Sequence, residues 1–131
     1  MAEGQNALLT LTSGTFNTAA GFLSLKSNTT GKFNTASGAE TLLANTADQN
    51  TATGAGALLT DTTGGFNTAN GAFALFSNTI ASENTAIGAS ALQNNTTGGL
   101  RPEAEQLRSV QTRPSAPRRS SPTPPAAPTP L

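Results

Sequence analysis

The tripeptide Asn-Thr-Ala recurs along this chain at an almost constant interval, and this periodicity constrains the fold more than any other feature. Its five copies start at Asn17, Asn34, Asn50, Asn67 and Asn84, so the interval is the same at every step except the shorter one between Asn34 and Asn50. A unit this short, about 17 residues, cannot bury enough apolar surface to fold alone, but stacked units share a continuous core. We therefore number each position by its phase, with the Asn of Asn-Thr-Ala at phase 0.

Three further positions of the unit are invariant, because phase 4 is always glycine, phase 8 is always leucine and phase 12 is always threonine. The glycines are Gly21, Gly38, Gly54, Gly71 and Gly88, and the leucines are Leu25, Leu42, Leu58, Leu75 and Leu92. Ala2, Gly4 and Leu8 keep the same register, so residues 1–100 hold about six copies and the chain opens in mid-repeat. This opening predicts either a fragment of a longer array or a subunit whose open end is covered by another copy.

The unit favours strands over helices. Fixed phases 0, 2 and 4 alternate with variable ones, which is the period-2 pattern of a strand. One invariant leucine per unit cannot make the apolar stripe of a helix. We predict an all-β fold, a β-solenoid (β-helix or β-roll) of about six coils, one for each repeat unit, over residues 1–100. Alanine and leucine columns would form its core, and Asn at phases 0 and 11 would occupy corners, tolerating left-handed backbone and hydrogen bonding along the stack.

Phenylalanine recurs less regularly. Phe16, Phe33 and Phe66 share phase 16, but Gln49 and Glu83 occupy that phase in other copies. A column that accepts Gln and Glu does not belong to a deep core. We expect these three Phe side chains to be partly exposed, either at an interface between solenoids or as half-buried surface.

The repeat pattern stops at Arg101. All eight prolines lie within residues 102–130, so residues 101–131 are predicted to be a disordered, Pro- and Arg-rich tail. The segments Pro-Ser-Ala-Pro and Pro-Thr-Pro-Pro are candidate ligands for proline-binding domains, although a tail without that role is the plainer interpretation.

Composition argues against most catalytic and cofactor chemistry. The chain has no Cys and no His, which removes the usual zinc ligands, the commonest general base and any disulfide bond. Its carboxylates fall at unrelated phases, with Glu40 at 6, Asp48 at 14, Asp61 at 11 and Glu83 at 16. Acid–base catalysis needs two groups that converge on one spot. We expect no enzyme activity, no cofactor and no metal site.

Charge and hydropathy limit the partners. The formal net charge is zero and charged residues make up 11% of the chain, so a basic surface for nucleic acid is not expected. No run of about 18 apolar residues occurs, which argues against insertion into a membrane. The first residues also lack the basic start and apolar stretch of a signal peptide.

The unit N-T-A-x-G-x-x-A-L-x-x-N-T-T-G resembles the repeat arrays of bacterial and phage tail-fibre-like proteins. It is also distantly similar to the head repeats of trimeric autotransporter adhesins. The matching residues run from Asn17 to Gly31 and recur in later copies, best over 67–79. The resemblance implies an extended β-solenoid, often trimeric, at a cell surface or on a virion. Adhesin-head repeats are shorter than this unit, which leaves the coil cross-section, its handedness and the trimer open.

Three functional hypotheses follow. The first is a structural or adhesive extracellular fibre component that assembles with itself, as a trimer or a head-to-tail filament, because open solenoid ends are strand edges. The second is an ice-binding solenoid that uses the threonine columns at phases 1 and 12. The third is a host-recognition segment of a phage tail fibre that binds surface carbohydrate. In a eukaryotic secreted protein, the sequons at Asn28 and Asn95 would be glycosylation candidates.

Overall fold

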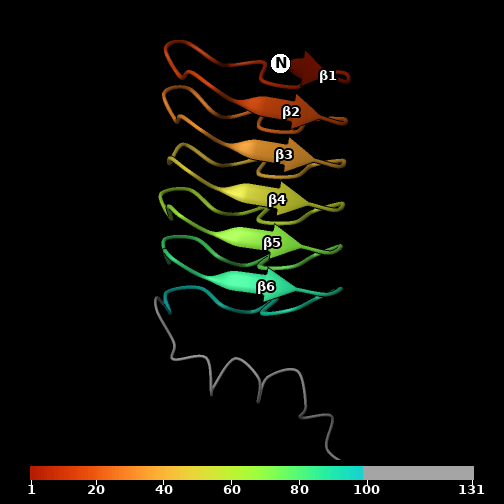
Figure 1. Cartoon of the computed structure of the whole chain (residues 1–131), viewed down its shortest axis with the longest axis vertical. Coiled ribbons are helices and arrows are strands. Elements are labelled where there is room, and N and C mark those ends of the chain that lie inside the picture. The colour runs from red at the N-terminus through yellow and green to blue at the C-terminus, as the bar shows by residue number, and fades with distance from the viewer. Residues whose placement is uncertain (99–131) are drawn as a thin grey trace, which may run out of the picture.

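The computed structural model describes residues 1–98, which form one stack of coils (Figure 1). Each coil contributes one short strand, and these residues contain no helix. The strands are β1 (Ala2–Glu3), β2 (Thr18–Ala20), β3 (Thr35–Ser37), β4 (Thr51–Thr53), β5 (Thr68–Asn70) and β6 (Thr85–Ile87). The predicted all-β solenoid, with one coil for each repeat unit, is therefore confirmed for this part of the chain. The predicted tail, residues 101–131, lies outside the described residues.

The strands pair in sequence order and every pair is parallel. The register joins equal phases, so Ala36 pairs with Ala52 and Ala52 pairs with Ala69. Parallel strands lie about 4.8 Å apart, which places each coil directly on the next. The shorter step between Asn34 and Asn50 does not disturb the register, because Thr35 still pairs with Thr51. Equal phases therefore form columns along the whole stack.

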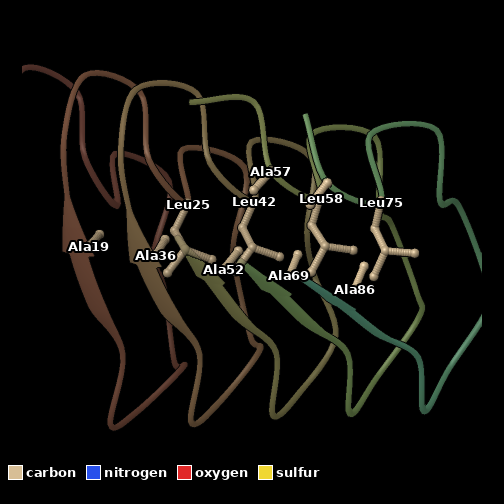
Figure 2. Close-up of a cluster of buried hydrophobic side chains, with 11 residues drawn as sticks. Ala19, Leu25, Ala36, Leu42, Ala52, Ala57, Leu58, Ala69, Leu75 and Ala86 are labelled. Carbon is tan, nitrogen blue, oxygen red and sulfur yellow. The ribbon is translucent and has the colours of Figure 1, made fainter. Parts of the chain in front are cut away.

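Two of these columns make most of the core, as Figure 2 shows, and the buried alanines Ala57 and Ala74 at phase 7 complete it. Alanines at phase 2 point inward from the strands, while Thr at phase 1 and the residue at phase 3 are exposed in β3 to β6. Leucines at phase 8 fill the space in front of the alanines; Leu42 and Leu58 have no exposed surface. Leu8 and Leu92, in the first and last described coils, are only partly buried. The core is therefore one Leu and one Ala thick, which suits a chain poor in aromatic residues.

Hydrogen bonds between coils continue beyond the strands. At phase 4 the N–H of Gly38 donates to the carbonyl of Ala20 in the preceding coil, at 2.7 Å. At phase 8 the N–H of Leu42 donates to the carbonyl of Ala57 in the following coil, at 3.0 Å. Each coil is therefore bonded on both sides by its loops as well as by its strand.

Left-handed backbone occurs at phases 4, 6, 8 and 16. The invariant glycines at phase 4 have φ between 115° and 137°, a region that side chains rarely adopt. Leu42 at phase 8 has a φ of 52°, and Phe33 at phase 16 has a φ of 58°. The expectation that the asparagine corners are left-handed is wrong, because no Asn at phase 0 or 11 has a positive φ among residues 1–98. The turn is made one residue earlier, at phase 16.

Buried hydrogen bonds explain why asparagine occupies phase 0. Oδ1 of Asn17 accepts from the N–H of Asn34 at 2.9 Å, and Oδ1 of Asn34 accepts from the N–H of Asn50 at 2.9 Å. Nδ2 of Asn34 donates to the carbonyl of Ala47 at 2.8 Å. The amide thus satisfies backbone groups of its neighbours while its own polar atoms are paired. The same pattern continues along the phase-0 column at Asn67 and Asn84.

Candidate functional site

One wall of the stack has an open hollow of about 700 Å³. This wall consists of the corner segments, which we define as phases 11–16 of each coil. Residues 46–48 of one coil line the centre of the hollow. Thr30 and Lys32 line it from the preceding coil, and Thr63 and Phe66 line it from the following coil. It therefore spans at least three consecutive coils.

The hollow lies where one residue is missing from the repeat. Corner segment 45–49 has five residues, whereas 28–33, 61–66 and 78–83 have six. Hydrogen bonds locate the gap. Nδ2 of Asn28 donates to the carbonyl of Gly31, three residues on, while Nδ2 of Asn45 donates to that of Ala47, two residues on, both at 3.1 Å. The missing residue is therefore that at phase 13, between Thr46 and Ala47.

This gap shifts the numbering of the residues after it. Asp48 stands at phase 15, so its assignment to phase 14 by counting from Asn34 is wrong. The N–H of Phe66 donates to the carbonyl of Asp48 at 3.3 Å, as the N–H of Phe33 donates to that of Thr15. The irregular step was visible in the sequence, but the position of the gap needed these hydrogen bonds. Sequence reasoning did not predict the hollow itself.

The hollow combines groups of different chemistry. Asp48 is exposed, and its Oδ1 accepts from the backbone N–H of Lys32 at 2.8 Å. The hydroxyls of Thr30 and Thr63 make no hydrogen bond to another of residues 1–98. Phe66 is 60% exposed and contributes an aromatic ring to the lining. The lining thus offers hydrogen-bond donors, acceptors and one apolar ring face.

Asp61 is buried, unlike the other three carboxylates considered above. It takes the place of asparagine in the phase-11 column. The N–H of Gly64 and Nδ2 of Asn78 donate to its Oδ1 at 3.1 and 3.2 Å, while Oδ2 has no partner among the described residues. Burial raises the pKa of Asp61 to about 7, although hydrogen bonds from Gly64, Asn78 and Asn67 lower it. The neutral form of the carboxyl therefore predominates only below about pH 7.

The two threonine columns differ in how their hydroxyls are used. At phase 12, Oγ1 of Thr46 donates to the carbonyl of Thr62 at 2.8 Å, and Oγ1 of Thr62 donates to that of Thr79 at 2.9 Å. Phase-1 hydroxyls make no hydrogen bond within residues 1–98 and lie on the outer face of the sheet. Their neighbours at phase 3 vary in chemistry: Ala20, Ser37, Thr53, Asn70 and Ile87. A single regular column is thus available to order water on this face.

The three phenylalanines of phase 16 all lie on the surface. Phe16 is 76% exposed and Phe33 is 52% exposed. Their rings stack with centroids 5.0 Å apart and planes 9° apart. Gln49 separates this pair from Phe66, which lies at the hollow instead. The column thus splits into an exposed stacked pair and one ring that belongs to the hollow.

Asn28 is not an accessible glycosylation site in this fold. It has no exposed surface, and the Nδ2 atom that would carry a glycan donates to the carbonyl of Gly31. Asn95 is half-buried, and its Nδ2 donates to Oδ1 of Asn78 at 3.2 Å and to the carbonyl of Gly98 at 3.1 Å. A sequon requires only a threonine two positions after the asparagine, so the sequence could not show that these amides are hydrogen bonded within the corners.

The described residues contain no group of three or more side chains suited to hold a metal ion. Within residues 1–98 there is also no apolar helix of membrane-spanning length. Comparisons of the chain with family models, with curated proteins and with solved structures found no match.

Proposed function

We propose that this chain is a structural component of a fibre, outside the cell or on a virion, and that its solenoid stacks end to end on further copies of itself. The observation that carries this proposal is the strand edge that each end of the sheet presents among the described residues. Within residues 1–98, β1 and β6 each have a strand neighbour on one side only. Unpaired strand edges associate readily unless something covers them.

The two edges are complementary in their hydrogen bonding. In the inner coils the N–H at phase 4 donates to the carbonyl at phase 3 of the preceding coil, as Gly88 does to Asn70 at 2.7 Å. Within residues 1–98, Gly4 has no such acceptor and the carbonyl of Ile87 has no such donor. A second copy placed with Gly4 beside Ile87 would continue the ladder without a change of register.

The same relation holds on the leucine side of the coil. The N–H of Leu75 donates to the carbonyl of Ala91 at 2.9 Å. At the two ends of the described stack, the N–H of Leu92 lacks a carbonyl of a following coil, and the carbonyl of Ala7 lacks an N–H of a preceding coil. Stacking would also cover Leu8 and Leu92, the two core leucines that are only partly buried.

The way the repeat uses its residues also supports a structural role. Phases 0, 2, 4 and 8, which are the same in every copy, provide the amide ladder, the core and the close contact between coils. The resemblance to tail-fibre-like arrays favours a surface location. An adhesive contact would then involve the exposed residues, and the stacked pair Phe16 and Phe33 is a lateral surface for a trimer.

Electron microscopy and sedimentation of the full chain over a range of concentrations test this proposal. We expect rods that lengthen with concentration. The variant Ala2→Pro removes an outward N–H at the free edge of β1, where proline is tolerated. It should abolish elongation without changing the circular dichroism spectrum. A monomer at all concentrations, or discrete trimers that persist in Ala2→Pro, would contradict end-to-end stacking.

A further inference from the structure

We propose that the hollow at corner segment 45–49 binds a neutral saccharide, as one or two sugar units of a glycan. This goes beyond the proposed structural role, because the hollow lies on the side of the stack and not at its ends. The missing phase-13 residue interrupts a wall that is otherwise filled by six-residue corners at 28–33, 61–66 and 78–83. A binding site therefore arises from a single local departure from the repeat.

The lining has the two kinds of surface that a sugar ring needs. A sugar presents hydroxyls that donate and accept hydrogen bonds around its edge and a C–H face that packs on an aromatic ring. Asp48 supplies an acceptor, the hydroxyls of Thr30 and Thr63 serve as donors and acceptors, and Phe66 supplies the ring. The hydrogen bond from Lys32 N–H to Oδ1 holds the carboxylate of Asp48 in place, while Oδ2 remains available to a ligand.

Size and charge favour this class of ligand over others. A volume of about 700 Å³ suits a small molecule and exceeds what a single ion needs. Lys32 is the only cation of the lining, too little positive charge for a nucleic acid backbone. Asp48 is its only carboxylate, too few oxygen ligands of that kind for a calcium ion. The polar side chains around the centre would leave an apolar ligand facing unpaired hydrogen-bonding groups.

Titration of the ¹⁵N-labelled full chain with cellobiose and with maltose, followed by NMR, tests the proposal. We expect chemical-shift changes centred on residues 46–48 and on Thr30, Thr63 and Phe66, with a Kd of about 1 mM for at least one disaccharide. Shifts that are absent for both disaccharides, or that spread evenly over the coils, would overturn it.

Two variants separate binding at the hollow from general effects on the fold. Phe66→Ala should weaken binding about fivefold to tenfold through loss of the ring face. Phe16→Ala is the matched control, because Phe16 has the same phase, is exposed and lies outside the hollow. Insertion of one threonine between Thr46 and Ala47 restores the full-length unit and should abolish binding. Equal weakening in Phe16→Ala, or binding that survives the insertion, contradicts the assignment.

Saccharide binding at the hollow should not depend on end-to-end stacking of copies. Ala2→Pro, which blocks the free edge of β1, should leave the shift changes at Asp48 and Phe66 unchanged. A chain that elongates but binds neither disaccharide retains the structural role and loses the saccharide site. A chain that binds saccharide but stays monomeric retains the site and loses end-to-end stacking.

Discussion

A Cβ atom added to Gly54 would lie 2.6 Å from the carbonyl carbon of Gly71 in the next coil. No side chain fits at that distance, so the two backbones are in direct contact at phase 4. The same relation joins Gly71 to Gly88, at 2.5 Å. Glycine at phase 4 is thus required both by the left-handed backbone and by the neighbouring coil.

Gly54→Ala should destabilise the fold by about 2 kcal/mol or more, because it adds backbone strain and a clash with Gly71. Gly88→Ala is the matched control. Gly88 has nearly the same φ, 119° against 115°, but a Cβ there meets no atom of the described residues within 4 Å. In dilute solution, where no second copy covers the last described coil, it should cost only the strain, about 1 kcal/mol. Urea unfolding measures both, and equal losses would show that coil contact does not constrain phase 4.

Asn50→Ala should lower the free energy of unfolding by about 2 to 4 kcal/mol, since it leaves buried backbone groups unpaired. Oδ1 of Asn50 accepts from the N–H of Asn67 at 2.9 Å, and Nδ2 donates to the carbonyl of Gly64 at 2.7 Å. Asn70→Ala, at an exposed position of β5, should change stability by less than about 0.5 kcal/mol. Thermal unfolding of the two variants compares a corner amide with a surface amide, and similar melting temperatures would argue against the ladder.

Asp61 predicts an unusual pH dependence of stability. Its pKa is about 7 in the folded chain and near 3.8 when exposed, so the folded state holds the extra proton between these values. The free energy of unfolding should therefore be highest below about pH 4 and fall as the pH rises through 7, with an upper limit of roughly 4 kcal/mol. Asp61→Asn should remove this dependence and raise the melting temperature at pH 8.

Melting curves of the two proteins from pH 4 to pH 8 check this prediction. Glu40→Gln is the control, because it removes an exposed carboxylate at another phase. It should keep the wild-type pH dependence. An Asp61→Asn curve that still falls between pH 5 and pH 8 would show that Asp61 is not the titrating group.

Ice binding requires a regular, unobstructed array of hydroxyls, and the structure provides less than the sequence suggested. Thr46 and Thr62 represent a phase-12 column whose hydroxyls already donate to the next coil. We therefore expect ice crystals in a solution of the chain to grow with their normal shape and without thermal hysteresis. Faceted crystals whose shape depends on Thr51 and Thr68 would instead support the ice-binding hypothesis.

Spacing alone was enough to predict the stack, because glycine at phase 4 and leucine at phase 8 recur in every copy, including the shorter one that begins at Asn34. It could not predict where the chain turns. Propensity places left-handed backbone at Gly and Asn, whereas Leu42 and Phe33 adopt it because the coil geometry demands it. Inter-coil hydrogen bonds compensate the strain at such positions, and these are tertiary interactions that a single repeat does not display.

The position of the hollow could not be predicted from the sequence either. The shorter step between Asn34 and Asn50 was plain in the sequence, yet it is compatible with a missing residue at any of several phases. The hydrogen bonds of the phase-11 amides locate it. Asn28 donates to the carbonyl three residues on, at Gly31, whereas Asn45 donates to the carbonyl only two residues on, so the residue at phase 13 is the missing one. The side chains that surround Asp48 in the hollow come from the preceding and following coils, so they too depend on where the gap lies.

Every coil is joined to the next by hydrogen bonds that run along the stack, and this arrangement has a mechanical consequence. A force applied along the axis loads the junctions between coils in series, so the weakest one should open first while the others hold. An intact coil occupies about 4.8 Å of length, whereas the chain of one coil pulled straight spans roughly 60 Å. A rod built this way would lengthen in large discrete steps under tension, and each step would dissipate energy before the chain itself bears the load.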